Sequence, residues 1–269
     1  MTSQITPGTE RNLSNRVSIR TTLSNTLTMA YRNLLLIRRT PQQLFDVTVQ
    51  PILFTVMFTF LFGGAISGSV QGYLPIIIPG ILAQTGLTAC ITTGVQLRED
   101  MDKGVFYRFK SMPIARIAPL TGPLLADVVR YGIATALTFV MGYILGFRWA
   151  SVDGAVLGGL LIVYASWCIS WVFALLGVVA KTAQVVSGIS SAILFPLTFL
   201  SGAFVPTKTL PSWLQDFVNV NPITYIVSAI RQLLNQGTIG NDFWLSIIES
   251  VAVVLVFAPL TLRMYMRKA

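Results

Sequence analysis

The feature that most constrains this chain is a run of 51 residues, 47–97, that contains no Asp, Glu, Lys or Arg. One membrane crossing takes about 20 apolar residues, so this run holds two crossings and a short link. The whole chain is 54% hydrophobic and only 11% charged, with a mean hydropathy of +0.70. Soluble domains carry roughly 25% charged residues. The composition therefore excludes a water-soluble globular enzyme.

Other residue counts narrow the possible chemistry. The chain has no His, which excludes a histidine proton relay, metal ligand or general base. The two cysteines, Cys90 and Cys168, lie in apolar runs and are expected to be packing residues, not a disulfide or a metal site. The net charge of +9 is better explained by basic cytoplasmic loops than by a nucleic-acid partner.

Length and helix breakers predict six membrane spans in one domain, 21–269, preceded by a flexible cytoplasmic tail, 1–20. With the N-terminus inside, fifteen Lys and Arg residues lie on the inner side and three on the outer side. This asymmetry places both termini in the cytoplasm, which requires an even number of crossings. The predicted spans are about 47–66, 74–97, 119–147, 154–180, 184–205 and 244–263.

The segment 21–40 precedes the first span and has an amphipathic helical pattern. Leu23, Leu27 and Tyr31 recur at helical spacing, and Leu35 continues the series among basic residues. Such a helix suits the inner membrane surface. It is either a membrane-surface anchor or a lever that meets a cytoplasmic partner.

The polar loop 98–116 between the second and third spans mixes both charge signs with apolar residues such as Val105, Phe106 and Met112. A purely solvated loop does not need this apolar content, whereas a short helix that docks into a partner's groove does. The alternative is an ordinary inner loop.

Segment 206–243 is expected on the outer side. Its aromatic residues fit an interfacial belt, and Leu214, Phe217 and Val218 share one helical face. We predict short re-entrant helices that dip into the outer leaflet; the alternative is a surface loop on the headgroups.

Few charges lie inside the predicted spans. Asp127 and Arg130 are spaced i, i+3 toward the inner end of span three, where they can neutralise each other or snorkel. Glu249 lies toward the outer end of span six. Intramembrane charges are functional candidates, but a structural role is favoured for all three residues. A proton- or sodium-driven carrier usually needs a midplane carboxylate, and none is found.

Aromatic and small residues in the spans offer two further hypotheses. Phenylalanines at i, i+4 and i+8 in span one, with neighbouring threonines, either line a path for an apolar substrate or face lipid. The glycine pairs Gly142 with Gly146 and Gly154 with Gly158 are candidates for close helix contacts. The candidate path comprises Phe54, Thr55, Phe58, Thr59, Phe62, Phe195 and Phe199.

Several stretches in collinear order resemble one family: the permease subunits of type-2 ABC transporters, specifically the daunorubicin-resistance-like permeases of multidrug and polyketide exporters. The resemblance covers about residues 25–265. It is carried by Pro51–Ala65, Arg108–Arg116, Gly122–Arg130, Tyr143–Arg148, Phe195–Pro206 and Asn221–Thr224 with Arg231 downstream.

The resemblance implies an all-α integral membrane protein of the ABC type-2 exporter fold in the bacterial cell membrane. This fold has an amphipathic connecting helix, six spans and re-entrant outer helices between spans five and six. The working unit is two permeases, identical or different, with two cytoplasmic ATP-binding cassette ATPases. By position, the element that couples to the ATPase is Gly104, Arg108, Ser111, Pro113, Ala115 and Arg116.

The chain lacks the phosphate-cradling pattern Gly-x-x-x-x-Gly-Lys-Ser/Thr, so it is not itself a P-loop ATPase. We therefore expect a non-enzymatic transport subunit without a cofactor of its own, with ATP and Mg²⁺ bound by the partner. Its expected contacts are the ATPase, a second permease and membrane lipids, with no nucleic acid. The expected cargo is an amphipathic drug, polyketide or lipid-like molecule moved outward. The alternative is a self-contained secondary transporter or channel.

Overall fold

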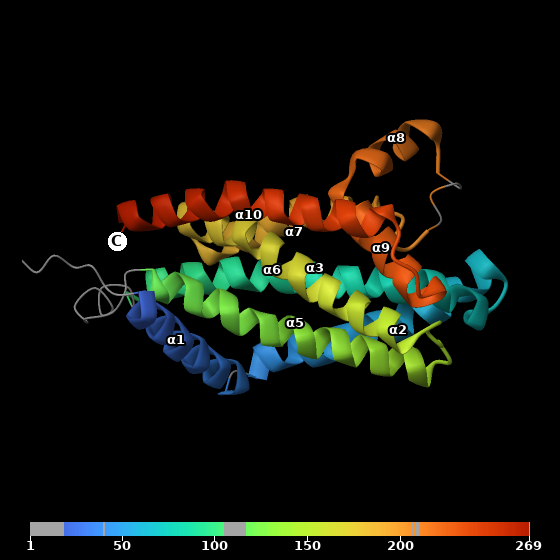
Figure 1. The fold of residues 1–269 in the computed structure, drawn as a ribbon, viewed down its shortest axis with the longest axis horizontal. Helices are drawn as coiled ribbons and strands as arrows, with labels where there is room; N and C mark the ends of the chain where they lie inside the picture. The colour runs from blue at the N-terminus through green and yellow to red at the C-terminus, as the bar shows by residue number, and fades with distance from the viewer. Residues whose placement is uncertain (1–18, 40, 105–116, 206, 208–209, 269) are drawn as a thin grey trace, which may run out of the picture.

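A computed structural model describes residues 19–39, 41–104, 117–205, 207 and 210–268, with side chains from residue 22 onward except 37–44 and 46–47. Regular structure in these ranges is helical throughout (Figure 1). The helices are α1 (Ile19–Arg39), α2 (Pro41–Ser67), α3 (Val70–Asp102), α5 (Ala118–Ile144), α6 (Val152–Val179), α7 (Ala183–Phe199), α8 (Ser212–Val220), α9 (Pro222–Gln236) and α10 (Asn241–Lys268).

Polar side chains mark where several of these helices begin. The Ser69 hydroxyl accepts a hydrogen bond from the Gly72 N–H at the start of α3, and Ser151 accepts one from Gly154 at the start of α6. Asn221 caps α9 by accepting from the Ile223 N–H. Such caps satisfy backbone donors that have no partner within the helix, so they set helix boundaries inside otherwise apolar sequence.

Five helices are long and apolar enough to cross a membrane: the Thr48–Ser67 part of α2, together with α3, α5, α6 and α10. They match the predicted spans one to four and six. The predicted span 184–205 corresponds to α7, which has 17 residues and ends at Phe199. At 1.5 Å per residue α7 is roughly 25 Å long, which is less than the bilayer's hydrocarbon thickness of about 30 Å.

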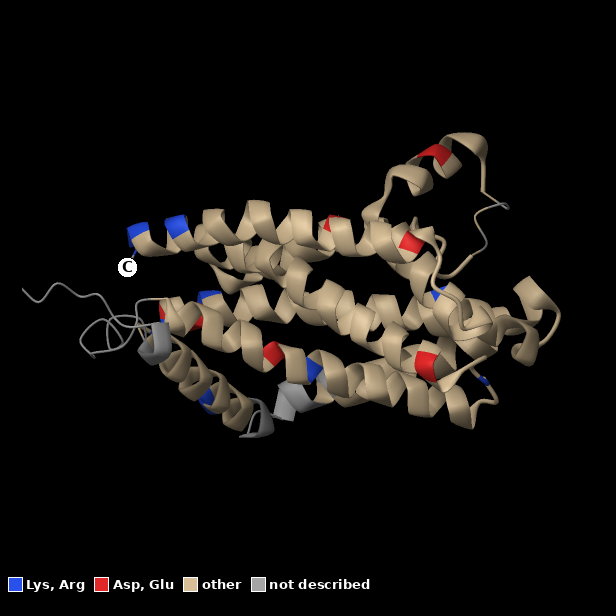
Figure 2. Cartoon of the chain, viewed as in Figure 1, with Lys and Arg blue, Asp and Glu red and all other residues tan. Residues whose placement is uncertain are grey.

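The long helices lie side by side along the longest axis of the molecule (Figure 1). The start of α1 and the end of α10 lie at one end of this bundle, and α8 and α9 lie at the other. Lys, Arg, Asp and Glu gather mainly toward the two ends, and few charges lie between them (Figure 2). This distribution suits a multi-pass membrane protein, because charged side chains are costly at the bilayer centre.

The central contact of the bundle is between α3 and α6, and small residues allow it. A Cβ atom added to Gly94 would overlap the carbonyl oxygen of Phe173, and one added to Gly177 would overlap that of Gly94. Backbones this close gain dispersion contacts over many atoms. The helix contacts therefore centre on α3 and α6. Of the glycines predicted for this role, Gly146 lies beyond the end of α5 at φ +102°.

Helix α1 is amphipathic as predicted, but its apolar stripe faces outward. Leu23, Leu27 and Tyr31 are exposed, whereas Met29 and Ala30 on another face are buried. The buried face packs on α5, where a Cβ atom at Gly122 would overlap Met29. The exposed stripe is therefore available to lipid, and α1 is held to the bundle by its other face.

The connection between α3 and α5 begins later than predicted. Residues 98–102 continue α3, and Arg98 pairs with Asp102 one turn away. The helix stops because the Lys103 and Gly104 N–H groups bond back to the last turn, with Gly104 at φ +65°. The coupling residues Arg108, Ser111, Pro113, Ala115 and Arg116 lie outside the described residues.

Candidate functional site

The phenylalanines predicted to line a path meet in one aromatic cluster. Phe58 stacks between Phe54 and Phe62 on α2, with ring centroids 5.6 and 5.5 Å apart. On α7, Phe195 stacks on Phe199 at 4.7 Å. The cluster therefore joins two helices that are more than a hundred residues apart in the sequence.

Phe204, which was not predicted, completes the cluster. Its ring lies 4.8 Å from Phe58 and 4.7 Å from Phe199. Phe58 and Phe204 are buried, whereas Phe195 is 55% exposed. The aromatic surface thus runs from the core of the bundle to its outside. Its use as a substrate path remains a prediction.

The two predicted path threonines lie on the buried face of α2. Thr55 and Thr59 are both fully buried. The Thr55 hydroxyl donates to the carbonyl of Pro51 at 2.7 Å, and that of Thr59 has no partner among the described residues. The hydroxyl proton of Thr55 is therefore already used in a hydrogen bond within α2 and is not available to a ligand.

Side chains from α3, from α9 and from Asn221, which lies between α8 and α9, fix the turn that carries Phe204. The Tyr73 hydroxyl donates to the Phe204 carbonyl at 2.7 Å, and Arg231 donates to the Gly202 carbonyl at 2.8 Å. Asn221 donates to the carbonyls of Leu197 and Leu200 at the end of α7. After α7 the backbone is no longer helical, so its carbonyl groups lack partners within a helix. These side chains supply the hydrogen bonds that the hydrocarbon of a bilayer does not offer.

Asp127 and Arg130 form the predicted pair, with 3.1 Å between Oδ1 and Nη2. Of the two possibilities, mutual neutralisation and snorkelling, the contacts favour the first, since the exposed fractions of Asp127 and Arg130 are 3% and 2%. Thr93 on α3 donates to Asp127 at 2.5 Å, and Arg130 donates to the Ala89 carbonyl at 2.8 Å. The pair therefore ties α5 to α3 inside the bundle.

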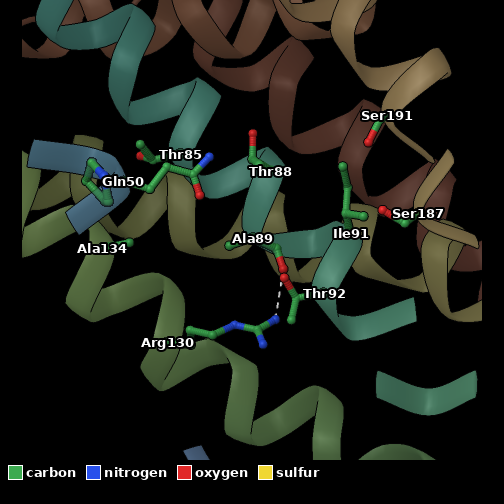
Figure 3. Close-up of a pocket in the computed structure, with 11 residues that line it drawn as sticks. Gln50, Thr85, Thr88, Ala89, Ile91, Thr92, Arg130, Ala134, Ser187 and Ser191 are labelled. Carbon is green, nitrogen blue, oxygen red and sulfur yellow. Dashed lines mark hydrogen bonds between the residues drawn. The ribbon is translucent and has the colours of Figure 1, made fainter. Parts of the chain in front are cut away.

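A polar cavity of about 190 Å³ lies beside this pair, between α2, α3, α5 and α7 (Figure 3). Figure 3 shows the Arg130 side chain reaching toward Ala89 at its edge. Sequence reasoning missed this cavity, because its lining comes from four helices. It is lined by Gln50, Pro51, Thr85, Thr88, Ala89, Ile91, Thr92, Arg130, Ala134, Ser187 and Ser191.

Glu249 lies within α10 and is partly buried. Its Oε2 atom has no hydrogen-bond partner among the described residues. Of the three charges predicted inside the spans, Asp127 and Arg130 have a defined set of partners among the described residues.

Comparison with known proteins identifies the family. The model of the ABC-2 type transporter family matches residues 24–235, most of the chain. The chain belongs to the ABC-2 type transporter family. This confirms the resemblance stated from the sequence motifs.

Relatives within the ABC-2 family are transport permeases. The chain is 40% identical over 255 residues to a daunorubicin resistance ABC transporter permease of Streptomyces coeruleorubidus, covering 92% of this chain and 88% of the relative. It is 30% identical to a doxorubicin resistance ABC transporter permease of Mycobacterium tuberculosis, over 60% of this chain and 56% of that protein. An inner membrane transport permease of Escherichia coli is 27% identical over 69% of this chain and 71% of its own length.

Proposed function

We propose that this chain is the permease subunit of an ATP-driven exporter that moves an amphipathic drug, polyketide or lipid-like molecule out of the cell. The observation that carries the proposal is the 40% identity, over 92% of the chain, to a daunorubicin resistance permease. The aromatic cluster supports it, because stacked rings suit flat apolar cargo.

We infer that a separate ATP-binding cassette ATPase, which binds ATP and Mg²⁺, supplies the energy for transport. It would bind the segment between α3 and α5, with Gly104, Arg108 and Arg116 among the contacts. In support, α3 ends and α5 begins at the end of the bundle where α1 starts (Figure 1). We assign this end to the cytoplasm, because the predicted excess of Lys and Arg lies there.

We propose six crossings, with α7 and the turn 200–205 together forming the fifth. The turn adds length to α7, and the bonds from Tyr73, Arg231 and Asn221 satisfy its backbone. We propose that α8 and α9 are re-entrant elements of the outer leaflet. Helix α9 supports this role, because Ile226, Ile230 and other residues on one face are buried against the bundle.

A second permease copy, identical or different, would complete the pathway. The outward faces of α2 and α7 carry exposed apolar side chains, including Leu53, Met57 and Ile189. These faces flank the aromatic cluster, so a partner there would enclose its exposed end. Transport then follows from differential binding of cargo in inward- and outward-facing states, whose populations ATP binding in the partner changes.

Reconstitution with and without the ATPase tests this function. The chain and its candidate ATPase are purified together in vesicles, and ATP-dependent daunorubicin movement is measured. Arg108→Glu and Arg116→Glu should abolish assembly or transport while the chain remains inserted. Lys208→Glu reverses a charge predicted on the opposite side and should have little effect. Uphill movement by vesicles that hold only this chain would instead support the secondary transporter.

A further inference from the structure

Arg130 is a buried cation that is only partly satisfied. Its Nη2 atom serves the Ala89 carbonyl at 2.8 Å, Thr93 Oγ1 at 3.2 Å and Asp127 at 3.1 Å. Its Nε and Nη1 atoms are buried and have no hydrogen-bond partner among the described residues. Beyond these contacts, the guanidinium lies 5.7 Å from the Tyr131 ring centroid. Since unpaired buried donors cost free energy, these nitrogens call for an acceptor.

Arg130 lines the polar cavity, which is the described space beside its guanidinium for such an acceptor. Among the described residues that line the cavity, Arg130 is the one that carries a charge. Asp127 does not line the cavity, and its carboxylate is already bonded by Thr93 and Arg130. The other polar groups in the described lining are uncharged: the hydroxyls of Thr85, Thr88, Thr92, Ser187 and Ser191 and the amide of Gln50.

On two helices the aromatic cluster begins about one turn from the cavity lining. Pro51 and Phe54 are three residues apart on α2, and Ser191 and Phe195 are four residues apart on α7. Residues at these spacings lie on the same helix face about one turn apart. Along α2 and α7, the polar lining with its cation is therefore adjacent to stacked aromatic rings. A polar cationic region next to an aromatic one matches an amphiphile with an anionic head and an aromatic or apolar body.

We propose that the cavity binds an anionic oxygen, such as a carboxylate, of an amphipathic ligand through Arg130, and that the apolar part of the ligand lies on Phe54 and Phe195. A guanidinium suits this role because its fork of N–H donors matches a carboxylate. The anionic group belongs either to exported cargo or to a phospholipid head. Assignment to cargo rests on the proposed exporter function; the binding site itself does not.

The test compares an acid with its neutral ester. The full chain in phosphatidylcholine nanodiscs is dialysed against labelled 1-naphthoate or methyl 1-naphthoate, which share an aromatic body and differ in charge. We expect saturable binding of the acid that is roughly tenfold tighter than that of the ester, equivalent to about 1.4 kcal/mol. Arg130→Gln should remove this preference, and Arg130→Lys should keep part of it.

Two further variants keep the test decisive if Arg130→Gln fails to fold. Ser187 is an exposed residue of α7, and Ser187→Leu fills the cavity while leaving the Asp127–Arg130 pair unchanged. It should reduce binding of the acid about as strongly as Arg130→Gln does. Arg148→Gln removes an arginine outside the cavity, which donates to the Tyr143 carbonyl, and should leave the preference intact. Equal binding of acid and ester by the wild-type chain, or unchanged binding of the acid in Ser187→Leu, overturns the proposal.

A second set of measurements, in which the lipid composition is varied, identifies the source of the anion. Replacing part of the phosphatidylcholine with phosphatidylglycerol should displace naphthoate if the site takes a lipid head, and should not if it takes a soluble acid. Either result supports an anion site and names its source. Binding needs no ATPase, so loss of ATP-driven export with retained binding refutes only the exporter function. Export with no acid preference refutes only this site.

Discussion

Gly177 of α6 lies so close to Gly94 of α3 that a Cβ atom on Gly177 would overlap the Gly94 carbonyl oxygen. The overlapping atom belongs to the backbone, so a side chain movement cannot relieve it. We expect Gly177→Ala to lower the free energy of unfolding by about 1–3 kcal/mol, the usual range for overpacking. Thermal unfolding in detergent measures the effect.

Gly132→Ala is the matched control. Gly132 is also within a long helix, α5, and nothing lies within 4 Å of the added Cβ atom. Alanine there should be neutral or should stabilise by up to about 1 kcal/mol, because it favours the helix. The two substitutions are chemically identical, so opposite signs isolate the packing contribution. A stabilised Gly177→Ala variant would show that α3 and α6 are further apart than described.

Asp127→Asn tests the buried ion pair. The substitution keeps the shape of the side chain but leaves Arg130 charged in a site where only 2% of it is exposed. Breaking a buried pair costs about 3–5 kcal/mol, so we expect a clear loss of stability rather than tolerance. The Arg98–Asp102 pair is the comparison, because its Asp102 side chain is 43% exposed, and Asp102→Asn should cost far less than Asp127→Asn. Equal losses would mean that the buried pair is hydrated.

Tyr73→Phe tests the turn after α7. It removes the hydroxyl that donates to the Phe204 carbonyl and leaves this buried oxygen without that donor. A lost buried hydrogen bond costs about 1–3 kcal/mol. Tyr225→Phe removes a similar bond to the Asn219 carbonyl in an exposed setting, where water replaces it, and should cost less. Hydrogen exchange at residues 200–205 should rise in the first variant only.

Hydropathy and helix-breaking residues predicted the long helices well, because a charge-free run has few alternatives to a membrane span. They failed where contacts with other helices determine the end of a helix. The helix after Ala183 stops at Phe199 although the apolar sequence continues, and Gly202 then adopts φ +69° in a turn held by residues from other helices. The local composition of residues 200–205 does not indicate which distant side chains will bind this turn.

The site was predicted in part, for a similar reason. The Phe54, Phe58 and Phe62 spacing showed that these rings share a face, but not that Phe204 would join them. The pairing of Asp127 with Arg130 follows from i, i+3 spacing, whereas its depth depends on how α5 is rotated toward α3. The polar cavity needs four helices to exist, and no single stretch of sequence indicates it.

Phe58→Ala tests the contribution of the aromatic cluster to packing. Phe58 is buried and contacts rings on its own helix, on α7 and in the following turn, so its loss should cost about 3–5 kcal/mol. Phe60 lies two residues away on the same helix, is 61% exposed and would face lipid, so Phe60→Ala should cost far less.

Transport separates the two roles of the cluster. Phe195 is 55% exposed at the outer edge of the cluster and contributes less to the core than Phe58. If the rings line a path, Phe195→Ala in the reconstituted complex should raise the apparent KM for daunorubicin several-fold with little change in melting temperature. Phe195→Tyr, which keeps the ring, should restore it. An unchanged KM in Phe195→Ala, with stability lost in Phe58→Ala, would assign the cluster to packing alone.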